Sequence, residues 1–507
     1  MNDNGMIKNI GNHAIDAAVS RIDALKSRLF GINPELARNL IREVTATRLF
    51  TLPAIIAAVL VLVYLLENGK VTDAFMAAAI FMYVMLGLFG TAAAGNSVLE
   101  EFGSRTWDFQ RMTAIGPWAM TWGKYAGATA VSWYGGLIVM AAYFAALLWP
   151  DVTDKWKYFQ TGIILIAGGA FMYAFALLTA LASAREAGHK AKSTATATMT
   201  LAFLGVMPLL GIIPAVYTEH TDYRWYYFGI SPFLLVTGSM VYFTGWLLAG
   251  AYRTMRAELQ YSNGLRVWAA FLLSLLVYAS GFVSDSAPVR LSAVEYVFRA
   301  SSLFIMVCAA LLYITAFVEP SGVIEYGRVL KAFRRRDRAG FLNEMPLWAI
   351  TFCAALASLV VMWACVAALA PGYVALSQQH QASIVERPLD MALFGSAFLM
   401  FMLRDILLLT LFRFSEQPRY IRVSFFTALT ALYLVVPKIL DAAGAGGMTI
   451  LFWPPLQYGA AIKISSITPT FAALCEAAAV FYLVRRRYRR LMSAAGAASG
   501  AVSAAAR

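Results

Sequence analysis

Residues 100–124 read E-E-F-G-S-R-T-W-D-F-Q-R-M-T-A-I-G-P-W-A-M-T-W-G-K, a polar stretch between two apolar runs. Gly103-Ser104 predicts the start of a short helix, and Gly116-Pro117 predicts its end. An amphipathic helix in this position lies along the membrane surface rather than across it. We interpret 100–117 as a surface helix on which a soluble partner can press.

Apolar runs like the two that flank this island recur along the whole chain. Of its 507 residues, 60% are hydrophobic and only 14% are charged, whereas soluble domains carry about 25% charged residues. The runs are about 20 residues long, the length of a helix that crosses a hydrocarbon core of ~30 Å. They are continuous rather than alternating, which favours helices over a transmembrane barrel. The sequence therefore predicts an all-α polytopic membrane protein.

The hydropathy pattern predicts about twelve spans. They fall at 50–66, 71–95, 118–148, 158–183, 195–217, 228–250, 266–283, 297–318, 346–370, 388–411, 423–441 and 467–485. If the N-terminus is cytoplasmic, the inside segments hold 30 of the 41 Lys and Arg residues and the outside segments hold 8. Cytoplasmic loops are the ones enriched in Lys and Arg. We therefore expect both termini to be cytoplasmic, in a bacterial inner membrane, and the net charge of +13 to reflect topology rather than a nucleic-acid partner.

A weak internal repeat suggests that the chain was duplicated. Residues 118–122 (W-A-M-T-W) open the third span, and residues 348–352 (W-A-I-T-F) open the ninth. Each motif follows a proline and a cytoplasmic segment that begins with an acid, and each is preceded by two spans and an interfacial stretch, 33–49 or 252–265. This pattern predicts two six-span halves in the same orientation.

The predicted halves are 33–250, with a coupling helix at 100–117, and 251–490, with a cytoplasmic docking segment at 319–345. An amphipathic segment, 1–32, precedes them. A low-complexity tail, 491–507, follows and is expected to be disordered. Parallel halves imply a substrate path between them.

The island also carries a motif-level resemblance. An interfacial helix before span 1, the acid-led island and a Gly-Lys pair entering span 3 resemble the membrane subunits of type-2 ABC exporters, whose usual pattern is E-x-x-x-G-T-x-x-x-L…P…G-K. The matching positions are Glu100, Gly103, Thr106, Pro117, Gly123 and Lys124. Ser104-Arg105 separate the glycine from the threonine, no leucine follows, and 319–345 contains no Gly-Thr pair.

The resemblance implies a permease whose coupling helices sit in clefts of cytoplasmic ATPase subunits. With both halves fused, the chain would work as a single-chain pseudodimer with two ATPase copies, which bind ATP and magnesium, and it would export an unidentified substrate. The residues implied in ATPase coupling are Glu100, Glu101, Gly103, Thr106, Trp107, Asp108 and Arg111, with Arg334, Arg335 and Arg336 in the second half.

The chain itself is not expected to hydrolyse ATP. A phosphate-binding Walker loop needs G-x-x-x-x-G-K-[ST]. The nearest string runs from Gly116 to Gly123-Lys124-Tyr125, with six residues between the glycines and a tyrosine after the lysine. The sequence also lacks a soluble region large enough for a nucleotide-binding fold, so we expect the ATPase activity in a partner chain.

Two other functions remain open. A secondary transporter of the major facilitator type also has six plus six spans, but its G-x-x-x-D-R-x-G-R-R-like signature is missing between spans 2 and 3. A membrane-embedded transferase needs acids or histidines gathered at one membrane face. The nearest such group is His220 with Glu219 and Asp222, which we interpret as a solvated loop. The four cysteines and four histidines have no spacing typical of a metal site.

The ionisable residues inside predicted spans include Arg404, Asp405 and Glu476. Such groups cost roughly 2.5–3.5 kcal/mol at the bilayer centre, so they face protein or water. They either line a substrate or proton path or pair between helices, and we favour pairing. Neighbours in sequence point apart on a helix, so we do not expect Arg404 and Asp405 to be each other's main partner. Gly123 and Gly127 have the spacing that permits close helix packing.

Overall fold

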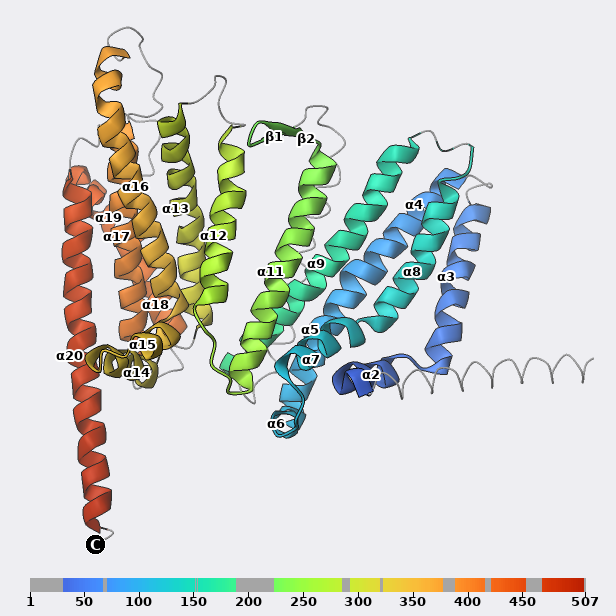
Figure 1. Ribbon diagram of the computed structural model, residues 1–507, viewed down its shortest axis with the longest axis horizontal. Helices are drawn as coiled ribbons and strands as arrows, with labels where there is room; N and C mark the ends of the chain where they lie inside the picture. The colour runs from blue at the N-terminus through green and yellow to red at the C-terminus, as the bar shows by residue number, and fades with distance from the viewer. Residues whose placement is uncertain are drawn as a thin grey trace, which may run out of the picture. The chain divides into compact units, whose positions relative to one another are not determined.

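The computed structural model is mostly helical and describes residues 31–66, 71–150, 152, 154–187, 223–284, 292–319, 322–376, 388–414, 421–452 and 467–505 (Figure 1). The chain forms two compact units. Unit 1 is Met1–Tyr223 with Gly229–Asn263, and unit 2 is Arg224–Phe228 with Gly264–Arg507. Within the described residues, strands are limited to β1 (Tyr223–Trp225) and β2 (Phe228–Ile230), which pair with each other.

Nine helices in the described ranges are long and apolar enough to cross a membrane. A tenth is obtained if the bent pair Pro117–Gly127 and Ala130–Ala146, which meet at 43°, is counted as one span. The protein is therefore a multi-pass, helical membrane protein. Of the twelve predicted spans, 195–217 lies outside the described residues, and 467–485 falls in a helix that is not among the nine.

The elements of unit 1 run from a surface helix through a series of apolar helices to α11. They are α2 (Pro34–Glu43), α3 (Ala46–Leu66), α4 (Val71–Met82), η1 (Tyr83–Phe89), α5 (Gly90–Gly103), α6 (Thr106–Arg111), α7 (Pro117–Trp122), η2 (Gly123–Gly127), α8 (Ala130–Ala146), α9 (Lys155–Ala187) and α11 (Pro232–Glu258). Helices α4, η1 and α5 follow one another without a break and form one span. A buried core joins α5, α9 and α11, with Val98, Leu177 and Met255 fully buried in it.

The predicted surface helix before the first span is present as α2. Asn33 caps it, because its Oδ1 accepts a hydrogen bond from the N–H of Leu36 at 3.1 Å, and Pro34 occupies its first position. Figure 1 shows α2 lying across the direction of the spans, at the same end of unit 1 as α6. The local sequence thus fixes where α2 begins.

The elements of unit 2 are again mostly long helices. They are α12 (Arg266–Ser280), η4 (Gly281–Ser284), α13 (Ala293–Val318), α14 (Val323–Arg334), α15 (Arg338–Glu344), α16 (Leu347–Leu376), α17 (Pro388–Arg413), α18 (Ile421–Thr430), η6 (Ala431–Val435), α19 (Val436–Ala442), η7 (Gly446–Leu451) and α20 (Thr468–Ala505). α13 packs along α16, and α17 packs along α20. Leu272, Phe304, Cys308 and Met362 lie in the core between α12, α13 and α16.

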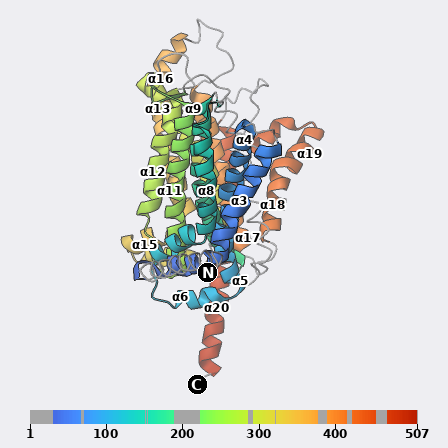
Figure 2. The ribbon, with the colours of Figure 1, turned by 90° about the vertical axis from the view of Figure 1, so that its right-hand side faces the viewer.

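Two predicted features at the ends of the halves differ from the structure. α11 continues to Glu258 and is followed by a turn and loop, so 252–265 forms no surface helix equivalent to α2. The tail expected to be disordered from residue 491 is instead part of α20, which continues to Ala505. Low sequence complexity suggested disorder, but alanine is the strongest helix former. Figure 1 shows α20 continuing beyond α14 and α15, and Figure 2 shows it continuing beyond α15. The segment 1–32 lies outside the described residues except for its last two.

Candidate coupling site

The polar island folds into a shorter helix than the sequence predicts. Gly103 is the last residue of α5 rather than the start of the island helix. Arg105 has a left-handed conformation, with φ of 61°, and turns the chain into the six-residue helix α6. α6 ends at Arg111, and Pro117 begins α7. The island therefore contains a sharp turn at Arg105 followed by a short helix, instead of one helix that fills 104–116.

α6 has one face fixed to unit 1 and one face open. Trp107 is only 2% exposed, and its ring stacks on that of Phe102 with centroids 4.4 Å apart. Phe109 and Met112 are 70% and 76% exposed. The predicted coupling residues on α6 divide between these faces. Trp107 is an internal anchor, while Thr106, Asp108 and Arg111 are exposed.

A cluster of four charged groups lies directly behind α6. Lys124 is fully buried, its Nζ lies 3.0 Å from Oε1 of Glu35, and it also pairs with Glu101. Nη2 of Arg38 lies 2.8 Å from the same oxygen of Glu35 and pairs with Glu101 as well. The negative charges of the two acidic side chains therefore balance the positive charges of the two basic ones. We call Glu35, Arg38, Glu101 and Lys124 the ion cluster.

The ion cluster joins three separate elements: α2, the end of α5 and η2. Asn39 supports it, because its Nδ2 donates to Oε1 of Glu35 at 3.1 Å and to the carbonyl of Gly123 at 3.2 Å. A Cβ at Gly123 would lie 2.5 Å from Cγ of Glu35, and one at Gly127 would lie 2.8 Å from Cβ of Asn39. The glycine spacing thus permits close packing as predicted, here between η2 and the surface helix α2.

The adjacent acids Glu100 and Glu101 have different environments. Glu101 is 5% exposed and belongs to the ion cluster. Glu100 pairs at the rim with Arg42, with 2.9 Å between Nη2 and Oε2, and both side chains are more than half exposed. Burial of Arg42 acts to lower its pKa, but the charges and hydrogen bonds of Glu100 and Glu43 together outweigh this and raise the pKa above its usual value. A pair this exposed adds at most about 1 kcal/mol.

The ion cluster touches the anchor of α6. Nζ of Lys124 lies 5.5 Å from the centroid of the Trp107 ring. If any one partner were removed, the remaining buried charge would lose its compensation, which costs about 3–5 kcal/mol in proteins. α2, α5 and η2 are therefore held together at the point where α6 is attached.

Unit 2 has no comparable cluster at the described residues of its docking segment. In the repeat that pairs Trp118 with Trp348, Cys353 and Ala354 stand where Gly123 and Lys124 stand in unit 1. Glu319, the acid at the end of α13, accepts a hydrogen bond from the N–H of Leu347 at 2.7 Å. The predicted coupling residues Arg334, Arg335 and Arg336 are exposed.

The three predicted intramembrane residues come together within unit 2, but not as expected. Arg404 Nη1 lies 2.6 Å from Oε2 of Glu476, and Nη2 lies 2.9 Å from Oδ1 of Asp405. The prediction that Arg404 and Asp405 are not principal partners is therefore wrong, because the long arginine side chain folds back along its own helix. Tyr313 and Tyr433 each donate to Oδ2 of Asp405 at 2.7 Å. This network ties α13, η6 and α20 to α17, as an interhelical pairing role requires.

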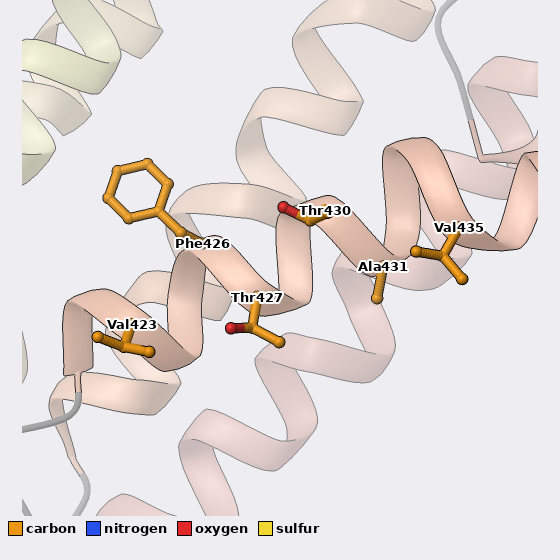
Figure 3. A pocket seen from close by; sticks show the side chains of 6 residues that line it. All are labelled: Val423, Phe426, Thr427, Thr430, Ala431 and Val435. Carbon is orange, nitrogen blue, oxygen red and sulfur yellow. The ribbon is translucent and has the colours of Figure 1, made fainter.

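A groove in unit 2 is lined by side chains of α18 and η6 (Figure 3). The lining residues are Val423, Phe426, Thr427, Thr430, Ala431 and Val435. None of them is charged. The described residues also contain no group of His, Cys, Asp and Glu that could hold a metal ion. The groove therefore suits apolar contacts and supplies no acid or base for chemistry.

Sequence reasoning overlooked part of both charged networks. Glu35, Arg38 and Asn39 are spaced i, i+3 and i+4, which places them on one face of α2. That polar face, together with the charged Lys124 inside a predicted span, was a signal in the sequence that α2 and Lys124 belong together. Tyr313 and Tyr433 carried no comparable signal.

Comparison of the chain with models of protein families, with curated proteins and with solved structures finds no match. The function is therefore inferred from the geometry of α6 and the ion cluster, together with the motif of the island.

Proposed function

We propose that this chain is the membrane-spanning permease of an ATP-driven exporter of the type-2 ABC kind, located in a bacterial inner membrane. In this proposal α6 receives the movement of a cytoplasmic ATPase subunit. The observation that carries it is the two-sided character of α6. Phe109 and Met112 are exposed, while Trp107 is buried against the ion cluster. An exposed apolar face on a helix that is rigidly anchored behind is what a docking and force-transmitting element needs.

Pressure on the open face of α6 would reach Trp107 and then the ion cluster. Because separation of Lys124 from Glu35 or Glu101 would leave buried charge uncompensated, α2, α5 and η2 are expected to move as one body. Movement then passes into α8 at the 43° bend that follows η2. η2 is a π-helical turn, a feature that is frequent at functional sites.

The partner supplies the energy in this proposal. ATP and magnesium are bound by the ATPase subunit, and the exposed Asp108 and Arg111 add charged contacts to it. A protein of this kind has two ATPase positions, of which the geometry of α6 supports the one on unit 1.

Co-purification with an ATPase tests the proposal. The tagged full-length chain is co-expressed with the ABC ATPase encoded beside its gene, and the bound ATPase is quantified after purification in mild detergent. The variant Phe109→Ser/Met112→Ser removes the open apolar face of α6. The matched control Tyr227→Ser/Phe228→Ser removes two residues that are 62% and 71% exposed at the β-ribbon.

We expect the wild-type chain and the control to retain the ATPase, and the α6 variant to lose most of it while unfolding at the same temperature. Stable wild-type protein that retains no ATPase would overturn the proposal, as would equal retention by the α6 variant. Substrate movement driven by a proton gradient without ATP would favour a secondary transporter instead.

A further inference from the structure

The helices α14 and α15 lie at one end of the membrane-spanning helices of unit 2. They connect α13 to α16, and both of these are membrane-spanning helices. α14 and α15 therefore lie at the membrane boundary, at the end where α13 finishes and α16 begins. Figure 1 shows both helices lying across the direction of the spans, with α20 passing beside them.

The α14–α15 hairpin, residues 323–344, is strongly basic. Its exposed cations are Arg328, Lys331, Arg334, Arg335, Arg336 and Arg338. The hairpin contains three acids, and two of them are engaged in helix capping. Glu325 accepts from the N–H of Gly322, and Asp337 accepts from the N–H of Gly340. With six cations against three acids, the hairpin keeps a net positive charge.

A second basic run lies against the hairpin. Residues 485–490 of α20 read R-R-R-Y-R-R. A Cβ at Gly327 of α14 would lie 3.2 Å from the hydroxyl of Tyr488, and the ring of Tyr488 lies 6.3 Å from that of Phe414 at the end of α17. We call the six cations of the hairpin and the five arginines of 485–490 the basic collar. Within the described part of the chain, none of these side chains forms an ion pair.

The hairpin also exposes apolar side chains among its charges. Ile324 and Phe333 are 69% and 65% exposed. Basic and apolar residues on one helix at the membrane boundary are typical of helices that lie in the head-group region, where phosphates and acyl chains are reached together. A soluble anion would pair with the basic side chains but would leave the exposed apolar side chains without a partner.

The hairpin differs from α6 in how it is attached. α6 is fixed to its unit through Trp107 and the buried Lys124, whereas Ala354 occupies the position of Lys124 in the repeat. α14 is held by uncharged contacts, such as the hydroxyls of Tyr326 and Thr410 at 3.2 Å. The cations of the hairpin thus do not help to attach it to unit 2 and are available to an external ligand.

We propose that the basic collar binds the phosphates of anionic phospholipids in the leaflet at its own end of the spans. Clusters of four to eight Lys or Arg next to a spanning helix attract anionic head groups in this way. The positive charge of the collar, its level at the membrane boundary and its exposed apolar residues favour lipid over the cleft of an ATPase. This inference concerns unit 2 and does not depend on the function proposed for α6.

The test uses the purified full-length chain in uncharged detergent, without ATPase. Mixed micelles containing increasing phosphatidylglycerol are added, and the midpoint of thermal unfolding is followed. Parallel titrations use phosphatidylcholine and inorganic phosphate. The collar variant is Arg334→Gln/Arg335→Gln/Arg336→Gln. The matched control is Lys155→Gln/Arg266→Gln/Arg299→Gln, which removes three exposed cations outside the collar.

We expect phosphatidylglycerol to raise the unfolding midpoint of the wild-type chain and the control at the same lipid concentration. Each cation near an anionic surface strengthens binding roughly fivefold, so the collar variant should need on the order of 100-fold more lipid. The effect should weaken at high salt. A second variant, Arg485→Gln/Arg486→Gln/Arg489→Gln, should behave in the same way and covers the case that the first fails to fold.

Several results would overturn the proposal. They are an equal response to phosphatidylcholine, an equal response to inorganic phosphate, and an unchanged lipid response in the collar variants. If the collar variants also lost the ATPase in the co-purification experiment described for α6, with their lipid response intact, the collar would be assigned to an ATPase instead.

Discussion

Nζ of Lys124, a fully buried lysine in the third predicted span, lies 3.0 Å from Oε1 of Glu35 on the surface helix α2. The two residues are far apart in sequence, and their contact attaches the surface helix to the third predicted span. We predict that Lys124→Met lowers the free energy of unfolding by about 3–5 kcal/mol, because Glu35 and Glu101 then remain buried without it. Chemical denaturation in detergent measures the change.

A control for this loss is Lys157→Met. Lys157 pairs with Asp154 at 3.5 Å, and both side chains are about half exposed, so the change should be below about 1 kcal/mol. If Lys124→Met were equally mild, the ion cluster would not hold α2, α5 and η2 together. If the proposed function is correct, the ATPase should still bind to Lys124→Met but should no longer be stimulated by it.

The close approach of α2 to η2 makes Gly123 sensitive to a single methyl group. In Gly123→Ala the new Cβ would lie 2.5 Å from Cγ of Glu35 and 2.7 Å from the backbone N of Leu36. We expect a loss of about 1–3 kcal/mol from overpacking, measured by the same denaturation. Gly103→Ala is the comparison, since nothing lies within 4 Å of its added Cβ. Similar losses in both would show that the methyl group acts through the helix and not through α2.

The Arg404 network is predicted to stabilise unit 2. Arg404→Met should cost about 3–5 kcal/mol, because Asp405 and Glu476 lose their shared cation in a buried site. Arg404→Lys should restore little, since one ammonium cannot reproduce the two separate contacts of the guanidinium. Thermal unfolding of both variants, compared with the exposed Glu344→Gln, tests this. Full recovery with lysine would show that the geometry of the arginine is unimportant.

The phenol of Tyr326 gives a prediction for alkaline pH. Burial raises the pKa of Tyr326 above its ordinary value of 10.0, and this outweighs the opposing effect of its hydrogen bond to Thr410. The unfolded chain therefore ionises first. The resulting contribution to stability is complete below about pH 10 and is lost as the pH rises toward the higher pKa of the folded state. In Tyr326→Phe, stability should fall less steeply above pH 10. Parallel pH–stability curves would contradict this.

Much of unit 1 could be predicted because its signals are local. Asn33-Pro34 marks the start of α2, and the apolar runs mark the spans. The length of α6 could not be predicted, because the left-handed conformation of Arg105 depends on how the chain turns back onto unit 1. The motif indicated Lys124 as important but gave no indication of Glu35, since that contact joins elements far apart in sequence.

In unit 2 the errors arose where a local rule met a tertiary contact. Side chains of neighbouring residues point apart on a helix, yet the guanidinium of Arg404 bends back to Asp405, because Glu476 of α20 and Tyr433 of η6 complete the site. The low-complexity tail was expected to be disordered but continues the helix α20, since alanine favours a helix whatever the complexity of its sequence.

α20 spans 38 residues in a single helix, about 57 Å at 1.5 Å per residue. Arg404 forms an ion pair with α20 near one end of the helix, at Glu476. If that ion pair acts as a fulcrum, a tilt of ten degrees displaces the far tip by several ångströms, on the order of 7 Å over the ~43 Å beyond Glu476. A spectroscopic label close to Ala505 would thus report small tilts of α20 that displace residues near Glu476 too little to detect.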